Sequence, residues 1–158
     1  MDLLFTPQNQ VNLTNFGAYG QTSSDNYAPK VTANSLPPIS NYGQVAVDYY
    51  KKANEKFLKK DFKGAKKNYT KAIEANPKFI DAYISRGRLK HNEFQDDLGA
   101  IEDYNKAIEL SPRYANTYFY RANAYRNLKN LVSACADWQT AGDLGSTDAK
   151  ESIHKHCK

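Results

Sequence analysis

The pattern of apolar and polar residues divides the chain into two parts. From Ala46 onward, apolar residues recur three and four positions apart, the spacing of one helix face, with Lys and Glu between them. Before residue 46 no helical or strand period is sustained. The pattern predicts helices over residues 46–59, 62–75, 80–92, 97–110, 114–127, 131–143 and 147–157.

The helical part repeats at intervals of 34 or 35 residues. Three similar blocks each carry a tyrosine followed four positions later by a small residue: Tyr49 and Ala53, Tyr83 and Gly87, Tyr118 and Ala122. Each block then carries alanine, an aromatic residue and alanine at fixed spacing: Ala65, Tyr69 and Ala72; Ala100, Tyr104 and Ala107; Ala134, Trp138 and Ala141. Residues four apart share a helix face, so the small residue lets a paired helix approach and the aromatic ring fills the space beside it.

The period and this order of small and aromatic positions resemble the tetratricopeptide repeat. The resemblance implies an all-α fold, an α-solenoid of three helix pairs (about 46–79, 80–114 and 115–146) with a capping helix at about 147–157. Pro77 and Pro112 end the first two blocks. One additional residue between Gly87 and Ala100 is placed in the turn near residues 93–97, where it should change little else.

The chain departs from the family pattern at several positions. Lys52, Arg86 and Arg121 stand where the family usually has leucine, and Lys56 and Lys90 where it usually has an aromatic residue. Ser146 replaces the closing proline of the third block. These changes affect the expected packing in detail and leave the predicted fold unchanged.

Residues 1–45 are interpreted as an extended arm that precedes a repeat domain of residues 46–158. The arm has three charges (Asp2, Asp25 and Lys30) and is otherwise mostly polar residues, glycine and proline, which cannot form a core of their own. It is a leader or linker, or it docks its scattered apolar residues on a surface. Its start lacks a basic region and a long apolar stretch, so we expect no signal peptide, and no run approaches the roughly 20 apolar residues of a membrane span.

The net charge of +5 is concentrated in the first block. Residues 46–79 hold ten lysines and four acidic residues, a net charge of +6. We define a candidate basic patch as Lys52, Lys56, Lys59, Lys60, Lys63, Lys66 and Lys67. It is either the solvated face of two helices or a surface for a polyanion. Nucleic acid is disfavoured because the first block contains no arginine.

The resemblance also implies a concave groove that holds an extended peptide. Carrying the family's groove positions onto this sequence gives Tyr50, Asn54, Phe57, Ile84, Arg88, His91, Asn92, Phe119, Asn123, Arg126 and Asn127. Asparagine offers a donor and an acceptor to a peptide backbone, and arginine can hold a carboxylate by two hydrogen bonds.

One subtype of the family binds the acidic C-terminal tails of heat-shock chaperones, using lysine, asparagine and arginine side chains. The corresponding positions here are Tyr50, Asn54, Ser85, Asn116 and Tyr120, of which only Asn54 matches. We therefore expect that this chain is not a chaperone-tail adaptor.

Other candidate chemistry is sparse. Cys135 and Cys157 should lie at similar heights on adjacent antiparallel helices, either as a disulfide or as buried thiols. Of His154, His156 and Cys157, only His154 and Cys157 could share a helix face, and no metal-ligand pattern is completed. No phosphate-binding or nucleophile motif occurs, so we expect no metal, no cofactor, no small-molecule substrate and no catalysis.

These observations predict a non-catalytic protein–protein interaction module, an adaptor or scaffold that binds an extended peptide of a partner protein. Two alternatives stay open: a structural subunit anchored in a larger assembly by its N-terminal arm, and a polyanion-binding surface on the first block. We expect the protein in the cytoplasm or within a multiprotein particle. The last helix pair is similar to the ending of many bacterial and cyanobacterial repeat proteins, which favours a bacterial or bacterial-virus origin.

Overall fold

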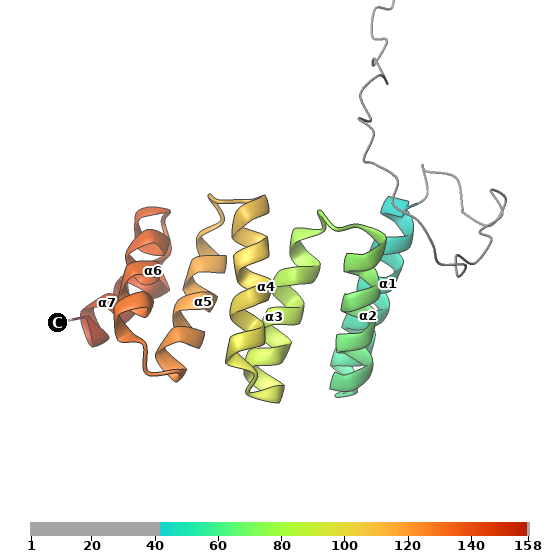
Figure 1. The fold of residues 1–158 in the computed structure, drawn as a ribbon, viewed down its shortest axis with the longest axis horizontal. Helices are drawn as coiled ribbons and strands as arrows, with labels where there is room; N and C mark the ends of the chain where they lie inside the picture. The colour runs from blue at the N-terminus through green and yellow to red at the C-terminus, as the bar shows by residue number, and fades with distance from the viewer. Residues whose placement is uncertain (1–41, 158) are drawn as a thin grey trace, which may run out of the picture. The chain divides into compact units, whose positions relative to one another are not determined.

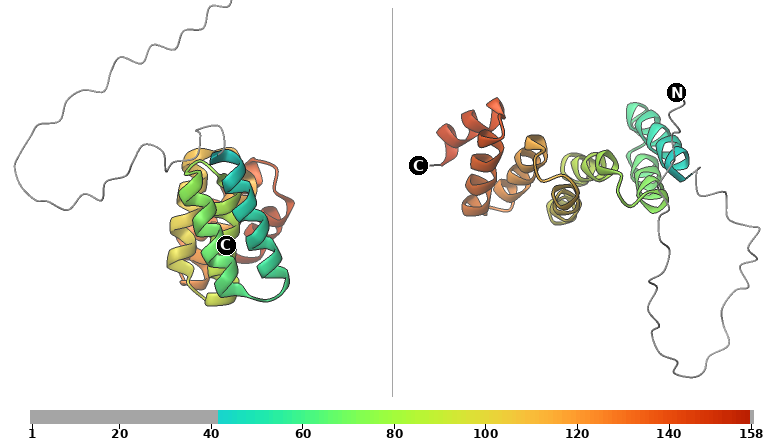
Figure 2. Two further views of the ribbon diagram at one scale, coloured as in Figure 1. Left: turned by 90° about the vertical axis from the view of Figure 1, so that its right-hand side faces the viewer. Right: turned by 90° about the horizontal axis from the view of Figure 1, so that it is seen from above.

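A computed structural model describes residues 42–157. Within them are seven α-helices: α1 (Tyr42–Leu58), α2 (Phe62–Ala75), α3 (Ile80–Phe94), α4 (Asp97–Leu110), α5 (Ala115–Asn127), α6 (Leu131–Asp143) and α7 (Thr147–His156). The described residues contain no strand. The helices form antiparallel pairs, α1 with α2, α3 with α4 and α5 with α6, and consecutive pairs lie side by side (Figures 1 and 2). The predicted all-α solenoid of three pairs and a capping helix is confirmed.

The first helix starts earlier than predicted. Helix α1 begins at Tyr42, so residues 42–45 belong to a helix and not to the arm. The first turn contains Gly43, a poor helix former, and no acidic residue, which is why the sequence pattern placed the start at Ala46. Gln44 nevertheless donates a side-chain hydrogen bond to Asp48 one turn later (2.9 Å). The rest of the predicted arm, residues 1–41, lies outside the described residues.

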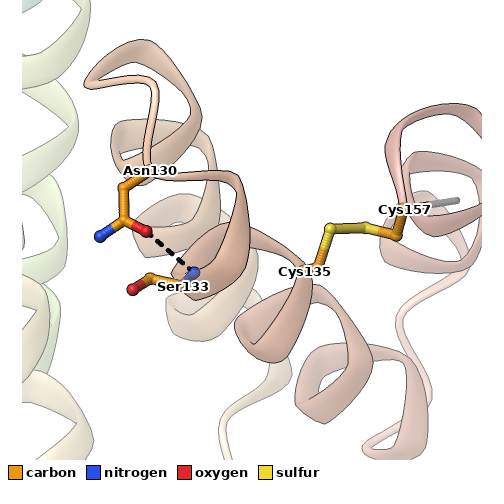
Figure 3. The surroundings of a disulfide bond; sticks show 4 residues. All are labelled: Asn130, Ser133, Cys135 and Cys157. Carbon is orange, nitrogen blue, oxygen red and sulfur yellow. Dashed lines mark hydrogen bonds between the residues drawn. A yellow bond between two sulfur atoms is a disulfide. The ribbon is translucent and has the colours of Figure 1, made fainter.

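The same turn joins the two helices of each pair. The residue before the second helix's N-cap has a positive φ: 58° at Lys60, 53° at Gln95 and 61° at Lys129. The next residue caps the second helix by accepting a hydrogen bond from a backbone N–H three positions on. These caps are Asp61 to Gly64 (2.9 Å), Asp96 to Gly99 (3.0 Å) and Asn130 to Ser133 (3.1 Å; Figure 3).

The additional residue of the second block lies at the end of α3. In the first and third turns the cap N–H bonds a carbonyl five residues back, Asp61 to Lys56 and Asn130 to Tyr125. In the second turn the backbone N–H groups of Gln95 and Asp96 both donate to the carbonyl oxygen of Lys90. The cap Asp96 thus bonds a carbonyl six residues back, so the last turn of α3 contains one more residue than the last turns of α1 and α5. Since Asp96 then caps α4 as in the other pairs, the extra residue changes the turn and leaves the following helix in register.

The core of each pair surrounds one aromatic side chain of the second helix. Tyr69, Tyr104 and Trp138 are buried there, next to alanines that let the helices approach. Gly87 is required by this packing, because a Cβ atom at that position would lie 2.7 Å from Cε1 of Tyr104. The other two pairs carry alanine at this position, Ala53 and Ala122, both fully buried.

The two arginines at expected leucine positions form ion pairs within their own helix pair. Arg86 contacts Asp103 through Nε (3.0 Å) and Nη2 (2.6 Å), and Arg121 contacts Asp137 in the same way (both 2.7 Å). Both aspartates are buried, and the hydrogen bonds that Arg121 donates to Asp137 raise the pKa of Arg121.

The third nitrogen of each arginine reaches back to the preceding helix pair. Nη1 of Arg86 donates to Thr70 of α2 (3.0 Å), and Nη1 of Arg121 donates to Asn105 of α4 (2.6 Å). Each arginine therefore joins three helices, and this substitution for leucine replaces an apolar contact with a geometrically defined one.

A disulfide attaches the last helix to α6. Cys135 of α6 and Cys157 at the end of α7 are bonded, with their Cα atoms 5.8 Å apart (Figure 3). Helix α7 buries only Ala149 completely, while Ile153 and His156 lie against α6, His156 stacked on Trp138 with ring centroids 5.5 Å apart. Of the two states that the sequence left open for these cysteines, the structure has the disulfide.

Candidate functional site

The candidate site begins with a cleft between α1 and α3. It has a volume of about 210 Å³ and is lined by Tyr50, Asn54, Phe57, Tyr69, Ser85, Arg88, Leu89 and Asn92. Five of these, Tyr50, Asn54, Phe57, Arg88 and Asn92, are groove positions predicted from the sequence. The cleft therefore combines aromatic walls with two amides and one guanidinium group.

Hydrogen bonds from neighbouring helices hold the polar walls of this cleft. The hydroxyl of Tyr69 on α2 donates to Oδ1 of Asn54 (2.6 Å), which leaves the Asn54 NH₂ group as a donor without a partner among residues 42–157. The hydroxyl groups of Tyr50 and Ser85 are 3.0 Å apart and hydrogen-bonded. Burial raises the pKa of Tyr69, so its hydroxyl keeps its proton and stays a donor at neutral pH. The orientation of Asn54 is thus fixed before any ligand binds.

Arg88 supplies the positive charge of the cleft. Its side chain is exposed, and its guanidinium carbon lies 5.0 Å from the ring centroid of Tyr120, a cation–π distance. None of the ion pairs formed among the described residues includes Arg88. Its guanidinium edge is therefore available to a carboxylate of a partner.

A second, more open cleft lies between the C-terminal ends of α3 and α5. It has a volume of about 620 Å³ and is lined by His91, Asn92, Gln95, Asp97, Arg126, Asn127 and Lys129. Nδ1 of His91 is hydrogen-bonded to Asp97 at the start of α4, so this ring nitrogen is occupied. Arg126 and Lys129 are exposed cations, and Asn92 borders both clefts.

Three predicted groove residues line neither cleft. Ile84 is buried against Tyr83 and Ala107, so it is a core residue of the second pair and not an apolar pocket of the groove. Phe119 packs against the core of the third pair, and Asn123 is half-buried outside both clefts. The family positions assume a regular spacing of side chains, whereas Ile84 and Phe119 are held in the cores of their own helix pairs.

The family groove positions missed side chains that line the first cleft. Tyr69 belongs to the second helix of its pair and reaches the cleft through its hydroxyl group. It does so because its side chain is long, and helix periodicity does not predict how far a side chain reaches. Ser85 was singled out only for the comparison with chaperone-tail binders, and it lines the cleft beside Tyr50. The second cleft includes Gln95 and Lys129, the two residues of positive φ, which only the turn geometry brings there.

The seven lysines of the candidate basic patch differ in their surroundings. Lys63, Lys66 and Lys67 lie together on α2, where they line a hollow with Lys71. Lys56 is paired with Asp61 (2.9 Å), and this hydrogen bond lowers the pKa of Asp61. Lys52 lies near the ring of Tyr49 (5.7 Å), and Lys59 and Lys60 are exposed in the turn after α1.

Residues 42–157 contain no group of three or more His, Cys, Asp and Glu side chains placed to hold a metal ion. Cys157, the thiol of the candidate His154–Cys157 pair, is bonded to Cys135. Over the same part of the chain, no helix combines the length and the apolar character that crossing a membrane requires.

Comparisons with known proteins identify the repeats. Two family models match the chain: a tetratricopeptide repeat model over residues 46–79 and a TPR repeat model over residues 97–129. A search of curated proteins found no match.

Solved structures share the fold. The first TPR of Spaghetti (RPAP3), solved with the HSP90 peptide SRMEEVD, is 24% identical, with a TM-score of 0.67 over 72% of this chain and 90% of that chain. The Arabidopsis OM64 TPR domain is 23% identical (TM-score 0.68; 73% and 97% covered). The N-terminal domain of stress-induced protein-1 from C. elegans is 19% identical (TM-score 0.69; 74% and 98% covered). The two matches identify residues 46–79 and 97–129 as tetratricopeptide repeats, and the solved structures share the fold of the chain.

Proposed function

We propose that this protein is a non-catalytic adaptor whose α1–α3 cleft binds an extended peptide segment of a partner protein. The observation that carries the proposal is the preorganised cleft, in which Tyr69 fixes Asn54 and Tyr50 is fixed by Ser85 beside an exposed Arg88. A side chain that is already oriented loses little conformational entropy when a ligand binds, so more of the interaction energy appears as affinity.

The chemistry of the cleft selects features of the peptide. The Asn54 amide donates to a backbone carbonyl, the exposed Phe57 offers apolar contact, and Arg88 pairs with an acidic side chain or a terminal carboxylate. The second cleft continues the same path with Asn92, which borders both, and offers Arg126 for a further acidic group. An extended peptide advances ~3.3 Å per residue, so one ligand of several residues spans both clefts.

A chaperone tail is not the expected ligand. Spaghetti binds the HSP90 peptide SRMEEVD, whereas here two of the five positions of the family's tail-binding subtype, Tyr50 and Ser85, are hydrogen-bonded to each other. A third position, Tyr120, lies against Tyr104 and under Arg88. The positive charge therefore comes from positions other than those of the tail-binding subtype, which favours a different peptide sequence.

Selection of a random peptide library on the full-length chain tests the proposal. We expect enriched peptides that carry Asp or Glu, and a loss of affinity of about tenfold for the Arg88→Gln protein, because a charge-assisted hydrogen bond contributes about 1.5–3 kcal/mol. Arg113→Gln is the matched control, since Arg113 is an exposed arginine outside both clefts. Equal affinities of the two variants, or no enriched peptide, would refute binding in this cleft.

A further inference from the structure

The outward face of α2 carries a hollow lined by lysines. The hollow has a volume of about 290 Å³ and is lined by Lys63, Lys66, Lys67, Thr70, Lys71 and Glu74. These six positions recur every three or four residues and lie opposite the buried face of α2, which contains Ala65, Tyr69 and Ala72. The hollow is therefore separate from the peptide cleft, whose contribution from α2 is Tyr69.

The charges of the hollow are not neutralised. Four lysines and one glutamate give it a net charge of +3, and none of the four lysines forms an ion pair with another residue of the range 42–157. In contrast, Lys56, Lys90 and Lys106 are each paired with an acidic residue. Four neighbouring like charges without partners lower the stability of the folded chain, so these lysines are not explained by a contribution to folding.

Two of the lysines are held in place by aromatic rings. Nζ of Lys66 lies 4.4 Å from the ring centroid of Phe94 on α3, and Nζ of Lys71 lies 5.2 Å from that of Tyr49 on α1. Both side chains are half-buried, in contrast to the exposed Lys63 and Lys67. A cation held over an aromatic face is more ordered than a free lysine, which makes the hollow partly preorganised.

The repeat fold itself does not require these lysines. The equivalent positions of α4 are Leu98, Ile101, Glu102, Asn105, Lys106 and Glu109, and those of α6 are Val132, Cys135, Ala136, Gln139, Thr140 and Asp143. One lysine occurs among these twelve positions, against four among the six of α2. The lysines therefore belong to the first pair in particular and not to the architecture that it shares with the others.

We propose that the lysine hollow on α2 binds an acidic segment of a second protein. Lysine presents separate, strongly hydrated point charges that suit individual carboxylates, whereas nucleic acid is usually held by arginine forks and by aromatic rings on which bases stack. The first pair has no arginine, and the nearby rings of Phe94 and Tyr49 are already covered by Lys66 and Lys71. With the peptide cleft on another surface, this site makes the protein a scaffold for two partners.

Fluorescence anisotropy with a labelled oligo-glutamate and the full-length chain tests this proposal. At a salt concentration of about 0.1 M, where long-range attraction is screened, we expect Lys63→Gln/Lys67→Gln to weaken binding about tenfold, because each exposed ion pair contributes up to about 1 kcal/mol. The control Lys51→Gln/Lys59→Gln removes the same charge from two exposed lysines of the same helix pair, and should weaken binding less than about twofold.

Further measurements separate the possible outcomes. Circular dichroism of all variants should be unchanged, since Lys63 and Lys67 are exposed and glutamine is a good helix former. In the Arg88→Gln protein, whose peptide cleft is weakened, Lys63→Gln/Lys67→Gln should still weaken oligo-glutamate binding about tenfold, which distinguishes this site from the peptide cleft. Equal losses in the two lysine variants would show that only net charge matters and would overturn the proposal. An oligothymidylate of equal charge that binds more tightly would overturn it in favour of nucleic acid.

Discussion

The first helix pair and the two that follow are built on one pattern but are held together differently. In the second and third pairs an arginine of the first helix forms a buried ion pair with an aspartate of the second helix and reaches back to the preceding pair. In the first pair the equivalent residues are Lys52 and Asn68, and Asn68 donates to Gly64 O of its own helix. Among the described residues no helix pair precedes α1 that could receive a third hydrogen bond from an arginine at position 52.

The difference shows that helix pairs built on one pattern can be held together in two ways. An arginine inside the array has three defined acceptors on two helices, so the cost of burying its charge is offset by hydrogen bonds. In the first pair the exposed Lys52 stands in the place of the arginine, with Nζ 5.7 Å from the ring centroid of Tyr49. Internal pairs are therefore joined to their neighbours by polar contacts, and the first pair is free to carry unpaired charge on its surface.

The largest expected effect comes from breaking an internal ion pair. Asp103→Ala leaves the guanidinium group of Arg86 without its carboxylate and should lower the free energy of unfolding by about 3–5 kcal/mol. Asn68→Ala at the equivalent position of the first pair should cost less than about 1 kcal/mol, because only a hydrogen bond within one helix is lost. Urea unfolding measures both values, and similar costs would contradict the distinction between the pairs.

Reduction of the disulfide should have the next largest effect. The bond closes a loop between residues 22 apart, and the chain-entropy relation gives about 3 kcal/mol for a loop of this size. Thermal unfolding with and without reductant measures the loss. The Cys135→Ser/Cys157→Ser protein should match the reduced chain and ignore reductant, and a thermal midpoint independent of reductant in the unaltered chain would contradict a stabilising bond.

The smallest effect is expected from installing the missing ion pair. Lys52→Arg with Asn68→Asp gives the first pair the arginine and aspartate of the others, in a more exposed setting and without the third acceptor. We expect a gain in stability below about 1 kcal/mol, the usual range for exposed ion pairs. A gain of several kcal/mol in urea unfolding would show that the third hydrogen bond is dispensable and that the first pair differs for another reason.

Much of the fold was predictable because helix periodicity and the small–aromatic pattern report directly on buried faces. The ion pairs were not anticipated, although the signal was present: Arg86 precedes Asp103 by 17 residues, and Arg121 precedes Asp137 by 16. The arginines were treated only as departures from leucine. When two blocks both carry a positive charge at one core position and a negative charge at another, the two charged side chains are expected to form a buried ion pair.

The candidate site was predictable only in part, for a local reason. The family positions brought Tyr50, Asn54 and Arg88 to one cleft, since regular helices place them on a common face. They also included Ile84, which is buried in a core cluster with Tyr83 and Ala107. The second cleft depends on residues of positive φ in the turns, and single-sequence periodicity does not specify turn conformation.

The disulfide also makes the two ends of the helical array differ in how easily they unfold. Helices of this array pack mainly on their neighbours along the chain, so local opening starts at the ends. Among residues 42–157, the covalent bond between α6 and α7 closes the C-terminal end, whereas no disulfide joins α1 to α2, so the first pair is expected to open more easily. Amide hydrogen exchange should therefore be fastest in the first pair and slow toward Trp138. The peptide cleft and the lysine hollow both include residues of this first pair, so a partner bound at either one slows exchange there most.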